Sequence, residues 1–166
     1  TPTQAPPAPT PSVPAAEAGG ACVYLDFAEL VEATGQSFSI AQAGGADVVV
    51  SCVLLTTAGS LPDITFTKAS TAADADTYWS EIAPDSADKI EDLGKTAYSA
   101  LRKKVKGGGP VVEIGWLTDG HMYSLRFTTA KGTSKDDASA TVKPLVKVAR
   151  AIAERAAAED ESDKDD

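Results

Sequence analysis

A two-residue turn between two alternating runs constrains the fold of this chain more than any other feature. Asp119–Gly120 suits a type I′ β-turn, and the runs on either side, 111–118 and 121–129, are rich in β-forming residues. A hairpin closed by this turn sets Thr118 against His121 and places three apolar pairs on one face: Trp116–Tyr123, Ile114–Leu125 and Val112–Phe127. Because turn chemistry and hydrophobic pattern select the same register, the sequence predicts a β-hairpin with one buried face.

Two helices are predicted before this hairpin. Asp26 is a good N-cap for a short helix that ends at Gly35, where a left-handed residue is needed. A second helix is expected over 72–83, with Ser70 or Thr71 as its cap. Both helices contribute an apolar face to a core.

A third helix is predicted from Ser134 to about Ala158. Ser134 and Asp137 form a capping box, and the apolar residues that follow recur at helical spacing. Pro144 falls inside this pattern, where proline removes a backbone donor, so a kink or a restart is expected there.

Strands are predicted in three further segments. The β-branched run 48–56 is expected to be a central strand, and 63–68 alternates and should pair antiparallel with it. Residues 97–105 read as a strand, although their alanine and leucine leave a helix open. Residues 36–46 are expected to be a loop. This order predicts an α+β fold with a mainly antiparallel sheet of about five strands and helices packed on one face.

The two cysteines indicate a disulfide bond. Cys22 and Cys52 lack the C-x-x-C spacing of a zinc site, and His121 alone is present to complete a metal set, which disfavours a metal centre. An even cysteine count and a secretory-looking start favour a disulfide over two free buried thiols. Closing a loop of about 30 residues would stabilise the fold by roughly 3–4 kcal/mol.

The two ends of the chain predict tails around one domain. Residues 1–19 are rich in proline, alanine and threonine, which predicts an extended tether in front of a domain over 20–158. Residues 159–166 hold six acids and one lysine, which predicts a disordered acidic tail. Such a tether at Thr1 is typical of a processed secretory product, with a signal peptide expected upstream, with or without a lipid-bearing cysteine. The alternative is a cytosolic fragment with a disordered arm.

Charge and hydropathy argue against nucleic-acid binding and against a membrane-spanning helix. The net charge is −9, which argues against a nucleic-acid footprint. No apolar run approaches the ~20 residues of a membrane-spanning helix. Membrane attachment is therefore expected only through an anchor upstream of Thr1.

Several short segments match a family pattern. They are CVYLD at 22–26, TGQ at 34–36, the second cysteine in a strand, and LGKTAY at 93–98. Together they resemble the small secreted two-cysteine domains of actinobacterial cell-envelope lipoproteins, which are families of unknown function. Val23 and Lys95 stand where that pattern has proline and aspartate. Over about 20–155, the resemblance implies an extracytoplasmic, secreted or lipid-anchored protein with one disulfide, and it supplies no catalytic residues.

Two groups of side chains are candidates for ligand or membrane contact. The first is the basic cluster Arg102, Lys103, Lys104 and Lys106, which attracts anionic surfaces or is simply a solvated loop. The glycines at 107–109 after it lack the order of a phosphate-binding P-loop. The second group is aromatic and would suit a glycolipid pocket, or else packs in the core: Trp79, Trp116 and Tyr123, with Tyr24, Tyr78 and Tyr98.

Catalytic chemistry has little support in the sequence. His121 lies near Asp119 and serines are plentiful, but no G-x-S-x-G elbow is present and a solvated histidine is ordinary at a turn. No cofactor is expected. The first hypothesis is a non-enzymatic cell-envelope lipoprotein, on the outer face of the plasma membrane, that acts through protein contacts as an accessory subunit of a membrane complex. The alternatives are a lipid or glycolipid carrier, which requires an enclosed apolar cavity, and a hydrolase that depends on His121.

Overall fold

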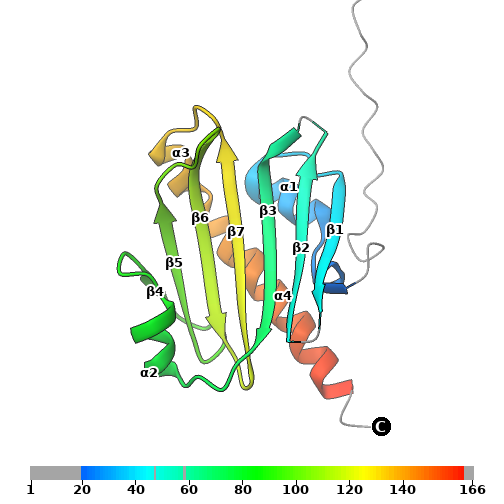
Figure 1. Cartoon of the computed structure of the whole chain (residues 1–166), viewed down its shortest axis with the longest axis vertical. Helices are drawn as coiled ribbons and strands as arrows, with labels where there is room; N and C mark the ends of the chain where they lie inside the picture. Colours follow the sequence, from blue (N-terminus) through cyan, green and yellow to red (C-terminus); the bar gives the residue numbers. More distant parts are fainter. Residues whose placement is uncertain (1–19, 47, 58, 163–166) are drawn as a thin grey trace, which may run out of the picture.

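An antiparallel sheet forms the frame of the molecule. The structure is a computed structural model that describes residues 20–46, 48–57 and 59–162, so the expected tether lies outside the described residues. Within them the sheet has seven strands: β1 (Ile40–Ala46), β2 (Val49–Thr56), β3 (Gly59–Ser70), β4 (Asp88–Ile90), β5 (Thr96–Arg102), β6 (Gly108–Leu117) and β7 (His121–Ala130). Their spatial order is β1–β2–β3–β7–β6–β5–β4, and every neighbouring pair is antiparallel (Figure 1).

The β6–β7 hairpin has the predicted register. Trp116 pairs with Tyr123, and the next two apolar pairs follow in step. Thr118 closes the turn by donating its backbone N–H to the carbonyl of His121 at 2.9 Å. The apolar members of these pairs are all buried, so the two-residue turn and the hydrophobic pattern do act together.

The α+β class is confirmed, but the prediction of about five strands is wrong. The extra strands are β1, in a segment expected to be a loop, and the short β4. The run 48–56 is not central, because β2 is second from the edge and β7 occupies the middle of the sheet. Strand β1 (IAQAGGA) escaped notice because its alanines and glycines have low β propensity, and pairing along the whole of β2 imposes the extended conformation.

Two helices and a helical turn cover one face of the sheet, here called the core face. They are α1 (Phe27–Thr34), α4 (Val142–Ser162) and the 3₁₀ turn η2 (Gly20–Tyr24), with α3 (Lys135–Ala140) just before α4 (Figure 1). Asp26 caps α1 and Gly35 ends it in the left-handed conformation, as predicted. The main core joins these helices to alternate residues of the strands, among them Leu30, Phe66, Trp116, Leu125, Leu145 and Ile152.

The predicted third helix is interrupted. Ser134 caps α3 by accepting from the backbone N–H of Asp137, and a new helix, α4, begins after Thr141. Pro144 is the third residue of α4, in the first turn, where its missing N–H breaks no helical hydrogen bond. Helix α4 continues to Ser162, so the segment 159–162 is helical rather than part of a disordered tail; 163–166 lie outside the described residues.

A short helical segment lies on the opposite face, here called the open face. It consists of α2 (Ala75–Thr77) and the π-helical turn η3 (Tyr78–Ile82), where one helix over 72–83 was expected. Asp74 is its cap instead of Ser70 or Thr71, because β3 extends to Ser70. Its buried Tyr78 packs in a second, smaller cluster against three residues of β5 and β6: Tyr98, Ala100 and Leu117.

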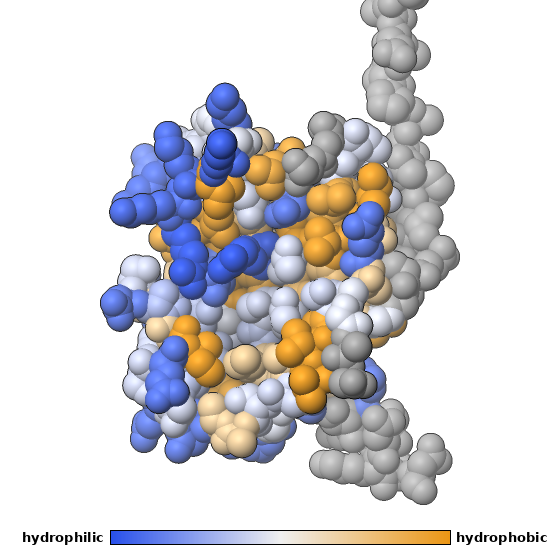
Figure 2. Space-filling model, viewed as in Figure 1, coloured by the Kyte–Doolittle hydropathy of each residue, from blue (hydrophilic) through white to orange (hydrophobic). Residues whose placement is uncertain are grey.

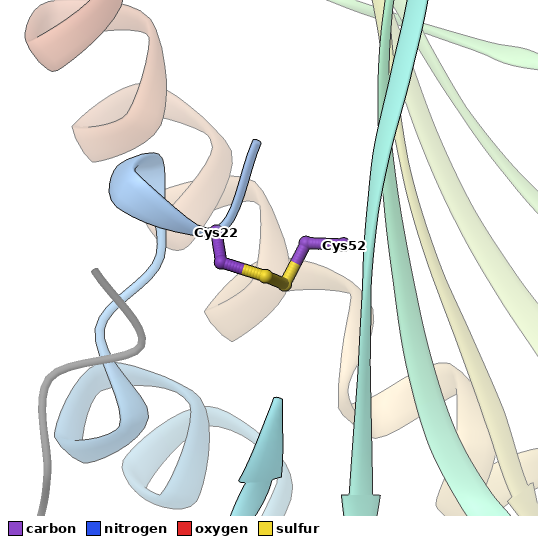
Figure 3. The surroundings of a disulfide bond; sticks show 2 residues. All are labelled: Cys22 and Cys52. Atoms are coloured by element: carbon purple, nitrogen blue, oxygen red, sulfur yellow. A yellow bond between two sulfur atoms is a disulfide. The ribbon is translucent and has the colours of Figure 1, made fainter. Parts of the chain in front are cut away.

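The predicted disulfide is present. Cys22 of η2 is bonded to Cys52 of β2, and both residues are fully buried (Figure 3). The bond ties the start of the described chain to the core face of the sheet. It also closes a loop that contains α1 and β1.

Candidate functional site

The open face divides into an apolar half and a charged half. Over β1–β3 its side chains include exposed Ile40 and Val49, which are 40% and 45% exposed, and half-buried Val53 and Leu55. Figure 2 views this face and shows hydrophobic residues over β1–β3 and mainly hydrophilic ones over the upper part of β5–β7. Helices α1 and α4 lie behind the sheet in this view, so they do not cover the apolar half.

Strand β1 is the edge of the sheet beside the apolar half. It has seven residues without charge or proline, and its segment 42–45 is exposed. Among the described residues it pairs only with β2. The other edge is different: β4 has three residues, two of them charged, and short charged edges resist pairing with other chains. Within the described residues, the sheet thus has one protected edge and one open edge.

The charged half is organised around one buried carboxylate. The Glu113 side chain, on β6, is 7% exposed. It accepts from Tyr98 Oη at 2.5 Å, from Arg102 Nε at 2.5 Å and from Arg126 Nη2 at 3.0 Å. The two arginines are 40% and 49% exposed, so the carboxylate lies beneath a pair of guanidinium groups that face solvent. This group of four residues is called the arginine cluster below.

Sequence reasoning singled out two members of this cluster, Arg102 and, among the aromatic residues, Tyr98. Arg102 was part of the predicted basic segment, whereas Glu113 and Arg126 were not singled out. They form a cross-strand pair between Val112–Phe127 and Ile114–Leu125, so the predicted hairpin register already implied their contact. Arg102 joins them from β5, a placement that local sequence does not reveal.

Close packing sets the position of Tyr98 in the cluster. Gly115 lies opposite Tyr98, and a Cβ at this glycine would stand 2.3 Å from Tyr98 Cε1 and 2.7 Å from the Tyr78 hydroxyl. Only a residue without a side chain lets both rings approach β6 this closely. The Trp79 indole packs edge-on against Tyr98 at 6.4 Å and donates to Thr96 Oγ1. The Tyr98 hydroxyl is therefore fixed where Glu113 can accept from it.

Electrostatics in the cluster favour the ionised carboxylate. Burial raises the pKa of Glu113, but the hydrogen bonds from Arg102, Tyr98 and Arg126 outweigh it, so the pKa lies below its usual value. Burial and the hydrogen bond to Glu113 raise the pKa of Tyr98, which keeps its hydroxyl protonated as a donor. The hydrogen bond to Glu113 also raises the pKa of Arg102.

One further carboxyl group lies near the arginines. Burial raises the pKa of Asp63 on β3, and a hydrogen bond with Thr128 and the charge of Arg126 partly offset this. Asp63 and Thr128 are cross-strand partners, two residues along from the pair Thr65–Arg126. The charged half thus extends across the β3–β7 pairing to the border of the apolar half.

The structure separates the other predicted contact residues. Lys103, Lys104 and Lys106 are exposed in the loop after β5, directly beyond Arg102. Trp79 is half-buried on the open face. Trp116 and Tyr123 are buried in the main core on the other face, where their rings stack at 5.1 Å. These two residues are not placed to touch a membrane or a surface ligand, because the hairpin turns them toward the helices.

His121 lies in a small hollow. The hollow, of about 210 Å³, is also lined by Tyr24, Lys68 and Ser70, the last being the cross-strand partner of His121. Lys68 Nζ donates to Tyr24 Oη at 3.2 Å. The histidine Nδ1 is buried without a hydrogen-bond partner among the described residues. Asp119 does not orient this histidine, since its carboxylate pairs with Lys95, so the Ser-His-Asp arrangement is not assembled.

A second hollow lies between α1 and α4. Its volume is about 570 Å³, within the range of ligand sites, but it is open to solvent. Half of its lining is charged: Glu29, Glu32, Lys143 and Lys147, with Ala33, Pro144, Val148 and Ala151. It is not the enclosed, aromatic-lined cavity between sheet and helices that the carrier hypothesis requires.

The described residues contain neither a metal-binding group of side chains nor a membrane-spanning helix. None of their His, Cys, Asp and Glu side chains form a group of three or more that could hold a metal ion. No helix in the described ranges is long and apolar enough to cross a membrane.

Comparison with known proteins assigns no family to this chain. The resemblance to cell-envelope lipoproteins therefore stays a prediction, and the functional interpretation rests on the open face and its two halves. No protein-family model, no curated protein and no solved structure matches this chain.

Proposed function

We propose that this chain is a non-enzymatic cell-envelope domain that binds another protein through the open edge of its sheet. The partner supplies an extended segment that pairs with β1, and the chain serves as an accessory subunit of a membrane complex. The observation that carries the proposal is the contrast between the two edges: β1 is long, uncharged and exposed, whereas β4 is short and charged.

The surroundings of β1 support this mode of binding. A partner strand added beside β1 continues the hydrogen-bond ladder of the sheet. Every second side chain of that strand then lies over the open face, on the side of the pair Ile40–Leu55. Main-chain hydrogen bonds supply affinity, and the apolar half of the face selects apolar side chains at alternate positions. The bound segment thereby shields the exposed apolar residues of this half from solvent.

Charge favours a partner protein over a second copy of this chain. Each copy carries a net charge of −9, so two copies repel each other as they approach. An uncharged or basic segment meets no such barrier. The partner segment is therefore expected to be extended, apolar at alternate positions and without net negative charge.

The disulfide supports an extracytoplasmic place for this activity, because such bonds persist in oxidising compartments. A lipid anchor upstream of Thr1 and an origin in an actinobacterial envelope belong to the proposal and have their support in the sequence pattern alone.

Site-specific photo-crosslinking in the cell that makes the protein tests the proposal. A crosslinking residue at Gln42, on β1, should capture one polypeptide in stoichiometric amount, and one at Lys89, on β4, should capture none. The isolated complex should show β1 backbone amides protected from hydrogen exchange. Gln42→Lys should abolish capture by a crosslinker at Ile40, since edge lysines block strand addition, while the uncharged control Gln42→Thr should retain it.

Three outcomes would overturn the proposal. They are crosslinks only to a second copy, equal capture from both edges, and a captured partner that leaves β1 amides unprotected. A discrete lipid-sized adduct at either hollow, with no polypeptide, would instead favour the carrier hypothesis.

A further inference from the structure

We propose that the arginine cluster is a binding site for a phosphate group. The site consists of Arg102 and Arg126 on the open face, with Glu113 beneath them as the residue that positions both. This inference is independent of the β1 edge, because the cluster lies on the β5–β7 half of the sheet.

The geometry of the cluster fixes two guanidinium groups with one carboxylate. Arg102 directs its Nε to Glu113 Oε2, and Arg126 directs its Nη2 to the same oxygen, at 2.5 and 3.0 Å. The other carboxylate oxygen is taken by Tyr98 at 2.5 Å. Since Glu113 is held from both oxygens and packed under the sheet surface, each arginine is oriented before any ligand arrives.

Each arginine keeps donors for a ligand. A guanidinium has five N–H donors, and only part of this set is directed at Glu113. Both side chains are close to half exposed, and neither has a second carboxylate within ion-pair distance among the described residues. Two such forks side by side match the oxygens of a phosphate, which arginine binds in a bidentate manner.

The local charge favours an anion. The two arginines exceed the single charge of Glu113, and the loop beyond Arg102 adds Lys103, Lys104 and Lys106, all exposed. Asp63 is a further carboxyl group near Arg126, and burial raises its pKa. Even with both carboxylates ionised, this region is positive in a chain whose net charge is −9.

A purely structural role would not require this arrangement. A salt bridge with one arginine would neutralise Glu113, and burial of a carboxylate costs free energy that an apolar pair would avoid. With the second arginine, the group of Glu113 and its two arginines carries a net positive charge at the surface. A positioned, half-exposed arginine pair is the arrangement found where phosphate or carboxylate oxygens are recognised.

The first experiment measures binding of two probes to the full chain. Inorganic phosphate is titrated while the arginine side-chain N–H resonances are followed by NMR. Vesicles of phosphatidylcholine with and without phosphatidylglycerol are tested by flotation. Saturable phosphate shifts in Arg102 and Arg126 indicate a soluble phosphate ligand, and flotation with the anionic vesicles alone indicates a lipid headgroup; either result supports the site.

Variants separate a built site from general attraction. Arg126→Lys keeps the charge but loses the fork, and it should weaken binding about tenfold, the value of one charge-assisted hydrogen bond. Glu113→Gln should also weaken binding, because the arginines lose their anchor, although it removes a negative charge. The matched control Lys147→Ala, on α4, removes one charge away from the open face and should leave binding unchanged.

The direction in which each variant changes binding distinguishes a built site from general attraction by charge. Stronger binding in Glu113→Gln, or a loss of binding in Lys147→Ala with none in Arg126→Lys, would show that only net charge matters and would overturn the proposal. No binding of either probe would overturn it as well. Because Arg126 is half exposed, its lysine variant should fold normally, so the test stands even if Glu113→Gln is unstable.

Discussion

The disulfide is the single bond whose removal should change the stability of this domain most. Cys22 and Cys52 are 30 residues apart, and reduction releases this loop in the unfolded chain. The loop-closure relation for such a separation gives about 3.6 kcal/mol at 25 °C. For a domain of this size each kcal/mol corresponds to roughly 2–4 °C in Tm, so reduction should lower Tm by about 10 °C.

The assay compares oxidised and reduced wild-type protein by urea unfolding at 25 °C and by thermal melting. Reduced wild-type protein keeps both buried sulfur atoms, so the difference reports the cross-link rather than a cavity. The double variant Cys22→Ala/Cys52→Ala is the control, and its stability should not respond to reductant. If oxidised and reduced wild-type proteins melted within about 2 °C of each other, the loop-closure reasoning would be refuted.

Three further substitutions test the described packing and electrostatics. Gly115→Ala should destabilise the fold by about 1–3 kcal/mol in urea unfolding, because the new Cβ meets the Tyr98 ring; an unchanged midpoint would show that the ring moves aside. Because the pKa of Glu113 is lowered on folding, its carboxylate stabilises the native state above the ordinary carboxyl range, and this contribution is lost as the pH falls below about 4. The difference in Tm between wild type and Glu113→Gln should therefore shrink between pH 6 and pH 3, and a constant difference would contradict the pKa direction. Ser134→Ala should cost about 1 kcal/mol, since Ser134 caps α3, and Ser134→Asp should restore most of it; equal stability of all three proteins in urea would argue against the cap.

The sequence predicted those features that short-range rules determine. The β6–β7 register follows from a two-residue turn and a period of two, and the caps of α1 follow from Asp26 and Gly35. The same register could have revealed the pair Glu113–Arg126, because both residues lie on the polar side of the predicted hairpin.

Other features depend on contacts between distant segments. Strand β1 has a sequence of weak β propensity, and its pairing with β2 makes it a strand. Arg102 reaches Glu113 only because β5 lies beside β6, and Trp79 reaches Tyr98 only because the segment after β3 folds back over the open face. Composition could not distinguish the buried Trp116 and Tyr123 from surface aromatics, whereas their place in the hairpin register does.

The order of strands divides the sheet into two meanders. Strands β1–β3 form one antiparallel meander and β4–β7 form another, and each is built from neighbours in sequence. The sheet becomes continuous only where β3 pairs with β7, a contact between segments far apart in the chain. Forming this seam requires a large loop to close, so it should be the slow step of folding. The disulfide joins η2, just before β1, to β2 of the first meander, and it should therefore slow unfolding of that meander without accelerating closure of the seam.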